Sequence, residues 1–227
     1  MRGNGIVIAI DGPAGAGKST TARLVADQMG YLYLDTGAMY RAVGLAVLQQ
    51  GVDPDDADGV TAVCSALDIA FETRDGQLQT LLNGKNISDA IRSSEISQAA
   101  SRVAVHPGVR DVLVALQRAM GRDGGIVLEG RDTGTAIFPD AELKIFLVAD
   151  PAERARRRLR DLKKRGESAV FESLLDEIRV RDIRDRQTQL QRGAWPASDA
   201  VCIDTTELSI AEQVDRIVAL AHRQNRA

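Results

Sequence analysis

The chain of 227 residues has few cysteines, few histidines, few aromatic side chains and no long apolar run. Its two cysteines, Cys64 and Cys202, lie far apart and outside any metal-binding or redox spacing, so we expect buried free thiols. Nothing approaches the 18 consecutive apolar residues of a membrane span, and the first apolar strand begins within ten residues of the start. We therefore expect a cytoplasmic protein without a signal peptide or a membrane anchor.

The chain also has little lysine and no excess of positive charge. Its net charge of −3 argues against a general nucleic-acid binder. Of the 29 basic residues, 24 are Arg and 5 are Lys, and 11 of the arginines fall between Arg154 and Arg192. A GC-rich genome explains the overall ratio, but it explains the clustering less well. Because Arg is suited to bidentate phosphate recognition, the clustering indicates a phosphate-rich ligand.

The most informative stretch is an apolar strand, Ile6–Ile10, that runs into a glycine-rich turn and then a helix of about Thr20–Met29. The spacing matches the phosphate-binding loop G-x-x-x-x-G-K-[ST]. In such a loop, backbone N–H groups surround the β-phosphate, the lysine adds a charge, and the hydroxyl of Ser19 reaches Mg²⁺. A glycine-rich turn that matches by chance is the alternative, but the flanking strand and helix favour a nucleoside triphosphate site. The predicted nucleotide-binding residues are Gly12, Pro13, Ala14, Gly15, Ala16, Gly17, Lys18, Ser19 and Thr20.

A second candidate phosphate site follows the next predicted strand, Tyr31–Leu34. After Asp35, the run Thr36-Gly-Ala-Met-Tyr40-Arg41 opens a helix that we expect to reach about Gln50, with Thr36 as its cap. This places a hydroxyl, a tyrosine and an arginine at the end of a strand. A capped surface helix with an exposed arginine is the alternative.

Residues 51–105 interrupt the alternation of strands and helices. We expect a short helix up to about Leu67, and then a hairpin of strands 69–72 and 78–82 around Asp75-Gly76. A helix of about 95–104 follows, and Pro107 opens another, with Ser101 and Arg110 near their join. The pattern is typical of an α+β lobe inserted into a parallel sheet.

The parallel pattern returns with a strand Ile126–Glu129 and the loop Gly130-Arg131-Asp132-Thr133-Gly134-Thr135. An acidic residue at the end of a buried strand is where P-loop enzymes hold magnesium, so Glu129 is a candidate. Arg131 and Asp132 lie just past the strand, on the rim where parallel sheets bind ligands. The strand 143–148 follows.

The last third contains the basic helices. One begins at Pro151, a second spans about Phe171–Gln187, and the break at 163–167 predicts a mobile lid between them. On the second helix Arg181, Arg184, Asp185 and Thr188 share one face and can converge on a ligand, although an Arg181–Asp185 salt bridge within the helix explains the spacing equally well. A final strand at 200–203 and a helix capped by Ser209 complete the expected fold.

Together these segments resemble one family closely, the bacterial cytidylate (CMP) kinases, over essentially the whole chain. The segments that carry the resemblance are the loop at 10–20, Asp35-Thr-Gly-Ala-Met-Tyr-Arg41, Gly130-Arg-Asp-Thr-Gly-Thr135, Phe138-Pro-Asp-Ala141, Arg181-Asp182 with Asp185, and Asp204-Thr-Thr206. The phosphate loop alone does not distinguish kinases from one another, whereas the Asp35–Arg41 and Gly130–Asp132 segments together are specific.

The resemblance implies an α/β fold: a P-loop NTPase-type five-stranded parallel sheet flanked by helices, with an inserted nucleotide-monophosphate lobe and a short lid. We expect a single kinase domain with its core at 1–50, 106–150 and 195–227, the lobe at about 51–105 and the lid at about 155–190. The implied reaction transfers a phosphoryl group from ATP to CMP or dCMP with Mg²⁺. The implied partners are these small molecules, without nucleic acid or membrane, and the expected state is a monomer.

The resemblance also implies a role for particular residues. Thr36, Tyr40, Arg41 and Arg131 surround the acceptor phosphate. Ser101, Arg110 and Asp132 read the cytosine, Arg181 and Asp185 hold the sugar, and Arg157, Arg158 and their neighbours lie near the triphosphate. Lys18, Arg41, Arg131 and Arg181 neutralise the transferring charge, and Ser19 and Glu129 hold the metal.

One departure from the family pattern stands out. The family usually has another arginine three residues after Asp185 and a Pro-Leu pair shortly after, whereas this chain has Thr188 and roughly Gly193-Ala194. This puts one base or sugar contact in doubt, and Arg184 or Arg192 is the candidate replacement.

Two other functions share part of the pattern. A P-loop kinase of another acceptor, such as shikimate or thymidylate, shares the first 20 residues but should lack the long insertion. A nucleotide-binding switch or ATPase module is the other alternative. However, the chain has neither the Asn-Lys-x-Asp guanine reader of GTPases nor the signature stretch of ABC-type ATPases.

Overall fold

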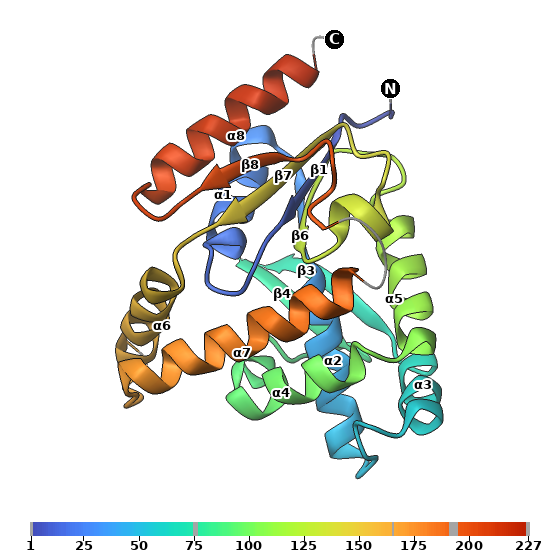
Figure 1. The fold of residues 1–227 in the computed structure, drawn as a ribbon. Coiled ribbons are helices and arrows are strands. Elements are labelled where there is room, and N and C mark those ends of the chain that lie inside the picture. Colours follow the sequence, from blue (N-terminus) through green and yellow to red (C-terminus); the bar gives the residue numbers. More distant parts are fainter. Residues whose placement is uncertain (1, 75–76, 165, 191–194, 226–227) are drawn as a thin grey trace. The chain divides into compact units, whose positions relative to one another are not determined.

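The computed structural model describes residues 2–74, 77–164, 166–190 and 195–225 (Figure 1). The chain divides into two compact units, Met1–Tyr33 with Gly121–Ala227, and Leu34–Met120. The expected insertion at 51–105 falls within the second unit, which begins earlier and ends later than that range. Each unit is described by itself.

The first unit contains the sheet strands, the glycine-rich loop and the basic helices. Its elements are β1 (Val7–Asp11), α1 (Lys18–Met29), the start of β2 (Leu32–Asp35), β6 (Ile126–Gly130), the π-helical turn η2 (Thr133–Ile137), β7 (Leu143–Val148), α6 (Pro151–Lys164), α7 (Phe171–Leu190), β8 (Val201–Asp204) and α8 (Ile210–Gln224).

The sheet has five strands in the order β2-β6-β1-β7-β8, which confirms the expected fold class. β1 pairs in parallel with both β6 and β7, and β7 pairs in parallel with β8. β1 is the central strand, and all five of its residues are buried. The register aligns Asp11 with Gly130 and with Phe146, so the loops that leave β1, β6 and β7 begin at the same edge of the sheet.

Helices α1 and α8 cover one face of this sheet. Ala22 and Val25 of α1 and Ile217 of α8 pack with the inward side chains of β1, β6, β7 and β8 in one buried cluster. A second, smaller cluster lies between α6 and α7, where Ala155 meets Leu174 and Ile178. Figure 1 shows these two helices side by side (brown and orange). The break between them begins at residue 165, which lies outside the described residues.

The second unit consists of helices and a small antiparallel sheet. Its elements are α2 (Thr36–Gln49), α3 (Ala57–Ser65), β3 (Ile69–Arg74), β4 (Gln77–Leu82), β5 (Lys85–Asn86), the 3₁₀ helix η1 (Ala90–Arg92), α4 (Ser94–Val103) and α5 (Pro107–Met120). β3, β4 and β5 pair in that order, and the predicted hairpin is confirmed, although its turn at 75–76 lies outside the described residues. Helices α2 and α4 approach closely at Gly44, where a β-carbon would lie only 3.0 Å from the backbone nitrogen of Ala100.

Two expectations are wrong in detail. Asp35, not Thr36, caps α2: its carboxylate accepts a hydrogen bond from the Ala38 amide at 2.9 Å, and Thr36 is the buried first residue of the helix. A carboxylate serves this end well because it also meets the positive end of the helix dipole. Cys64 is a buried free thiol as expected, and burial raises its pKa to about 11, but Cys202 on β8 is exposed.

The predicted cap of the last helix is confirmed and gives a test of its stability. Ser209 and Glu212 form a reciprocal capping box at the start of α8, the helix that covers the sheet. Ser209→Ala leaves the Glu212 amide in the first turn without its side-chain acceptor, so we expect the free energy of unfolding to fall by about 1 kcal/mol in urea denaturation. Asp215→Ala, an exposed change within the same helix, is the control and should stay within about 0.5 kcal/mol. Equal effects of the two substitutions would contradict the capping role.

Candidate active site

The loop between β1 and α1 is shaped by glycines that no other residue replaces without strain. Gly12 has φ +148°, and a β-carbon there would overlap the carbonyl oxygen of Leu147. Gly17 has φ +95° and directly precedes α1, so the loop delivers its last amide groups to the positive end of that helix. This is the backbone arrangement of an anion-binding loop.

Three carbonyls of this loop accept hydrogen bonds from side chains. Lys18 Nζ donates to the Pro13 carbonyl at 2.9 Å, Arg154 Nη1 to that of Ala14 at 3.1 Å, and Thr205 Oγ1 to that of Ala16 at 3.0 Å. In a trans peptide the C=O and the following N–H point in opposite directions. Holding the Ala14 and Ala16 carbonyls on the outside therefore directs the next N–H of each peptide to the inside, where a phosphate is expected.

The loop after β6 is fastened to the end of β1 by a buried carboxylate. Asp11 accepts hydrogen bonds from the Thr133 amide and hydroxyl, both at 2.8 Å, and from the Gly134 amide at 2.9 Å. Burial raises the pKa of Asp11, these hydrogen bonds lower it, and the nearby charge of Asp132 adds to the rise. The contacts set the position of the segment that begins with Arg131 and Asp132.

Lys18 lies buried among charges of both signs. Its pKa is lowered to about 7, first by burial and then by Arg131 and Arg181, while Glu129 and Asp11 oppose that shift. The two carboxylates therefore raise the pKa of Lys18 by less than burial and the two arginines lower it. A bound polyanion would restore the balance, because it favours the charged form of Lys18.

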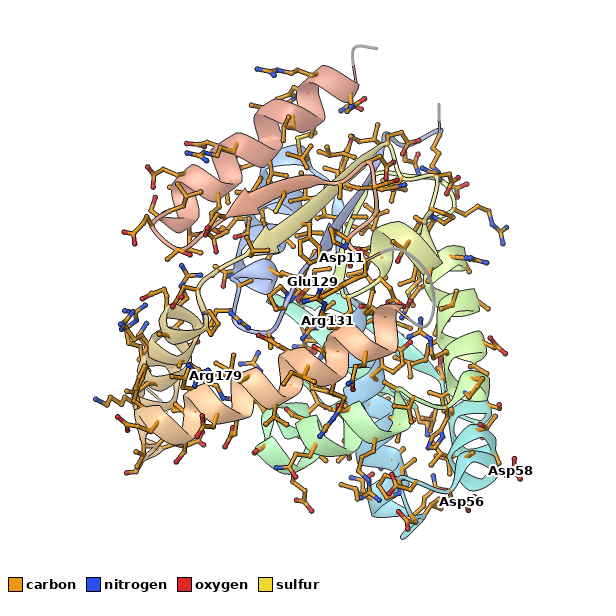
Figure 2. All side chains as sticks on the ribbon, viewed as in Figure 1. Asp11, Asp56, Asp58, Glu129, Arg131 and Arg179 are labelled. Atoms are coloured by element: carbon orange, nitrogen blue, oxygen red, sulfur yellow. The ribbon has the colours of Figure 1, made fainter. Side chains whose placement is uncertain are left out.

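Arg131, the first of these arginines, makes a short ion pair with helix α7. Its Nε lies 2.7 Å from Asp185 Oδ2, and although burial lowers the pKa of Arg131, Asp185 and Glu129 outweigh burial and raise it. Arg181 Nε lies 4.0 Å from the same oxygen, so the salt bridge within the helix is the weaker of the two. Figure 2 shows Asp11, Glu129 and Arg131 close together at the ends of β1 and β6, whereas Arg179, two residues before Arg181, lies away from them.

The predicted metal ligands offer hard oxygen donors. Glu129 is 4% exposed and accepts a hydrogen bond from the Tyr33 hydroxyl at 3.1 Å, while Ser19 is exposed in the first turn of α1. No cluster of three or more His, Cys, Asp or Glu residues suited to a metal occurs among the described residues. Mg²⁺ needs only one or two protein oxygens when phosphates and water complete its shell, so this donor set fits it.

Arg157 and Arg158, expected near the triphosphate, have different surroundings. Arg157 donates to the hydroxyl and the carbonyl of Thr205, which itself holds the Ala16 carbonyl, so Arg157 supports the glycine-rich loop from outside. Arg158 is half-buried, and its Nε makes no hydrogen bond within the described part of the chain.

The second unit brings together several of the predicted acceptor residues. On α2, Arg41 pairs with the capping carboxylate Asp35 at 2.7 Å, and Arg110 Nη1 of α5 donates to the Tyr40 hydroxyl at 3.2 Å. Thr36 is buried at the start of the same helix. Ser101 is half-buried on α4, next to the close approach to α2 at Gly44.

The site residues at the departure from the family pattern are described only in part. Arg184 is exposed on α7. Only the backbone of Thr188 is described, and Arg192 and Gly193–Ala194 lie outside the described residues. Which residue replaces the family arginine stays a prediction.

Sequence reasoning missed three residues that support the site. Arg154 and Thr205 hold the loop carbonyls, and Trp195 Nε1 donates to the Arg131 carbonyl at 2.6 Å while its ring meets Phe146 edge-on at 5.0 Å. Arg154 was one of several arginines in a charged helix, and the sequence around Trp195 gives no local signal for its contact with Arg131. Burial of Arg154, on a helix that also carries exposed arginines, was the missing information.

A parallel sheet whose central strand leads through a glycine-rich loop into a helix, with a buried lysine among arginines, defines a P-loop phosphotransferase. A solved gluconokinase from Sinorhizobium meliloti has a similar fold, with a TM-score of 0.50 and 16% identity over 100% of this chain and 96% of that one. This likeness concerns the fold alone.

The chain belongs to the cytidylate kinase family, whose model, described as "Cytidylate kinase", matches residues 8–223. It is 44% identical to the cytidylate kinase of Geobacter sulfurreducens, over 98% of this chain and 95% of that protein. It is also 44% identical to the cytidylate kinase of Pasteurella multocida, over 93% and 92%. A bifunctional pantoate ligase/cytidylate kinase of a Synechococcus strain is 49% identical over 96% of this chain and 41% of its own length.

The lowered pKa of Lys18 predicts proton uptake when a triphosphate binds. With a pKa of about 7, Lys18 is largely neutral at pH 8 in the free protein, and an adjacent phosphate favours its protonated form. Binding of a non-hydrolysable ATP analogue at pH 8 should therefore take up roughly 0.9 proton more in the wild type than in Lys18→Met. The affinity of the wild type should accordingly fall as the pH rises above 7.

Calorimetry in two buffers of different ionisation enthalpy measures this uptake. The titration of the analogue itself is common to both proteins and cancels in the difference. Equal proton exchange by the wild type and Lys18→Met would show that Lys18 is already protonated at pH 8.

Proposed function

We propose that this protein transfers the γ-phosphoryl group of ATP to CMP or dCMP, giving ADP and CDP or dCDP. Family membership supports the substrates. The observation that carries the chemistry is the position of Lys18, which is buried at the glycine-rich loop near Arg131 and Arg181, where burial and these two cations lower its pKa to about 7. Phosphoryl transfer needs this kind of site, because its transition state spreads negative charge over the oxygens of the transferred group.

In the proposed reaction the bond between the γ-phosphorus and the β–γ bridging oxygen breaks. A bond forms from a 5′-phosphate oxygen of CMP to the γ-phosphorus. The acceptor oxygen is already anionic, so no general base is required, and catalysis rests on positioning and charge neutralisation. In the first unit we assign neutralisation to Lys18, Arg131 and Arg181.

The glycine-rich loop would hold the donor phosphates through its inward amides. Ser19 and Glu129 would hold Mg²⁺, which would supply positive charge to offset that of the donor phosphates. Arg157 and Arg158 would serve the triphosphate side. The lid between α6 and α7 would exclude water, which otherwise accepts the phosphoryl group in place of CMP.

In the second unit, we assign Thr36, Tyr40 and Arg41 to the acceptor phosphate and Ser101 and Arg110 to the base. In the first unit, Asp132 would add to base recognition, and Asp185 with Arg181 would bind the sugar. Small-molecule substrates account for all these assignments, and the proposal requires no second chain, nucleic acid or membrane. Within the described residues, no helix is long and apolar enough to cross a membrane.

A coupled assay of ADP release with a panel of nucleoside monophosphates tests the function, and Lys18→Met tests the site. Loss of one contact to the transferring phosphate should raise the activation free energy with CMP by about 3 kcal/mol or more, which lowers kcat roughly 10²-fold or more. An unchanged circular dichroism spectrum must accompany the loss. Near-normal turnover of the variant, or a wild type that prefers a different acceptor, would overturn the assignment.

The arginines should separate according to their roles. Arg131→Met and Arg41→Met remove groups assigned to phosphates, so each should lower kcat with every acceptor. Arg110→Met removes a group assigned to the base, so it should mainly raise the KM for CMP and reduce the preference for CMP over UMP. An equal drop in kcat for all acceptors in Arg110→Met, with KM unchanged, would refute base recognition.

A further inference from the structure

Arg154 is almost completely buried, unlike the other basic side chains of α6 whose exposure is given. Its side chain is 3% exposed, whereas Arg156 and Arg160 on the same helix are 58% and 61% exposed and pair with Glu153. Burial of a guanidinium is costly unless its donors are satisfied, so its contacts indicate what it holds.

The guanidinium of Arg154 contacts three elements. Its Nε donates to the Ala149 carbonyl at 3.0 Å, at the end of β7, and its Nη1 donates to the Ala14 carbonyl in the glycine-rich loop. Nη1 and Nη2 also bind the two carboxylate oxygens of Asp182 on α7, at 2.9 and 2.5 Å. The pair is bidentate, which fixes the orientation of both side chains.

The stem of Arg154 also supports the loop. At Gly15, where φ is +77°, a β-carbon would lie 3.1 Å from Cβ of Arg154, so loop and stem are in close contact. Because the Ala14 carbonyl points to Arg154, the Gly15 amide points to the opposite side of the same peptide, into the loop. Arg154 thus sets the direction of an amide expected to bind a donor phosphate.

Asp182 connects Arg154 to the residues of α7 that we assign to the acceptor nucleotide. It directly follows Arg181, whose charge reaches Lys18, and lies one helical turn before Asp185, the partner of Arg131. Because Asp182 is held by Arg154, this turn of α7 is fixed by the same guanidinium that fixes the Ala14 peptide.

We propose that Arg154 is a positioning residue that holds the donor phosphate loop and the Arg181–Asp185 turn of α7 in one arrangement, through Ala14 and Asp182. This rests on the proposed function. Arg154 contacts no substrate in this proposal and acts through the loop amides and through α7.

The test compares Arg154→Lys, Asp182→Asn and the double variant. Lysine keeps the charge but has no planar fork, so it cannot hold Ala14 and both Asp182 oxygens at once. Asparagine keeps the shape of Asp182 and leaves the bond from Arg154 to Ala14 in place. The matched controls are Arg179→Lys and Asp176→Asn, which change exposed residues one turn or two before Asp182 on the same helix.

We expect Arg154→Lys to weaken binding of a non-hydrolysable ATP analogue about tenfold and to lower kcat at least tenfold per folded molecule. Asp182→Asn should raise the KM for CMP at least fivefold while analogue binding stays within twofold of the wild type. The double variant should be no worse than Arg154→Lys, because Arg154→Lys already breaks the connection to Asp182. The controls should stay within twofold in every measurement.

If Arg154 had a purely structural role, its substitution would lower the melting temperature, and the two single variants would not separate analogue binding from the KM for CMP. Analogue binding and kcat of Arg154→Lys equal to its control would overturn the proposal, as would additive effects in the double variant. If Arg154→Lys does not fold, Asp182→Asn decides alone, since an unchanged KM for CMP contradicts the link to α7. Failure of the proposed function would instead appear as a wild type that does not phosphorylate CMP, whereas analogue binding does not depend on the acceptor.

Discussion

The hydrogen bonds that Asp11 accepts join the two loops on which the first unit's chemistry depends. Asp11 ends the central strand, and its carboxylate holds the amides of Thr133 and Gly134, so the segment with Arg131 begins beside the glycine-rich loop. A buried carboxylate satisfied by backbone donors is rigid, because leaving those donors unpaired costs more than any single bond contributes. This contact helps to position Arg131, whose charge adds to burial in lowering the pKa of Lys18.

Positive charge is therefore concentrated before any ligand binds, and the surrounding contacts decide which cations remain available. Arg154 and Arg157 are taken up by carbonyls and by Asp182 or Thr205, so they shape the loop. Arg131 is held by Asp185. Lys18 donates to the Pro13 carbonyl, and burial followed by the charge of Arg131 lowers its pKa to about 7. An electrostatic site of this kind is preorganised, so little reorganisation is needed when charge develops during transfer.

Much of the fold followed from local pattern. The apolar runs at 7–11, 126–130 and 143–148 are strands buried on both faces, and Ser209 caps the last helix as expected. The cap of α2 was misassigned because Asp35 and Thr36 are both good caps, and only backbone geometry distinguishes them. The exposure of Cys202 was missed because a short strand has the same composition at the edge of a sheet as at its centre.

The sequence by itself determined the phosphate loop, because Gly12, Gly17 and Lys18 are defined by their spacing along the chain and backbone conformation follows from that spacing. It also determined the family, through the Asp35–Arg41 and Gly130–Asp132 segments. Only the tertiary structure decided what the arginines do. Arg154 and Arg156 lie two residues apart on one helix, yet one is buried against Ala14 and Asp182 and the other is exposed. Their difference depends on contacts with residues 28 and 140 positions away from Arg154. Side chains of one type acquire different roles through such long-range packing, which no local pattern encodes.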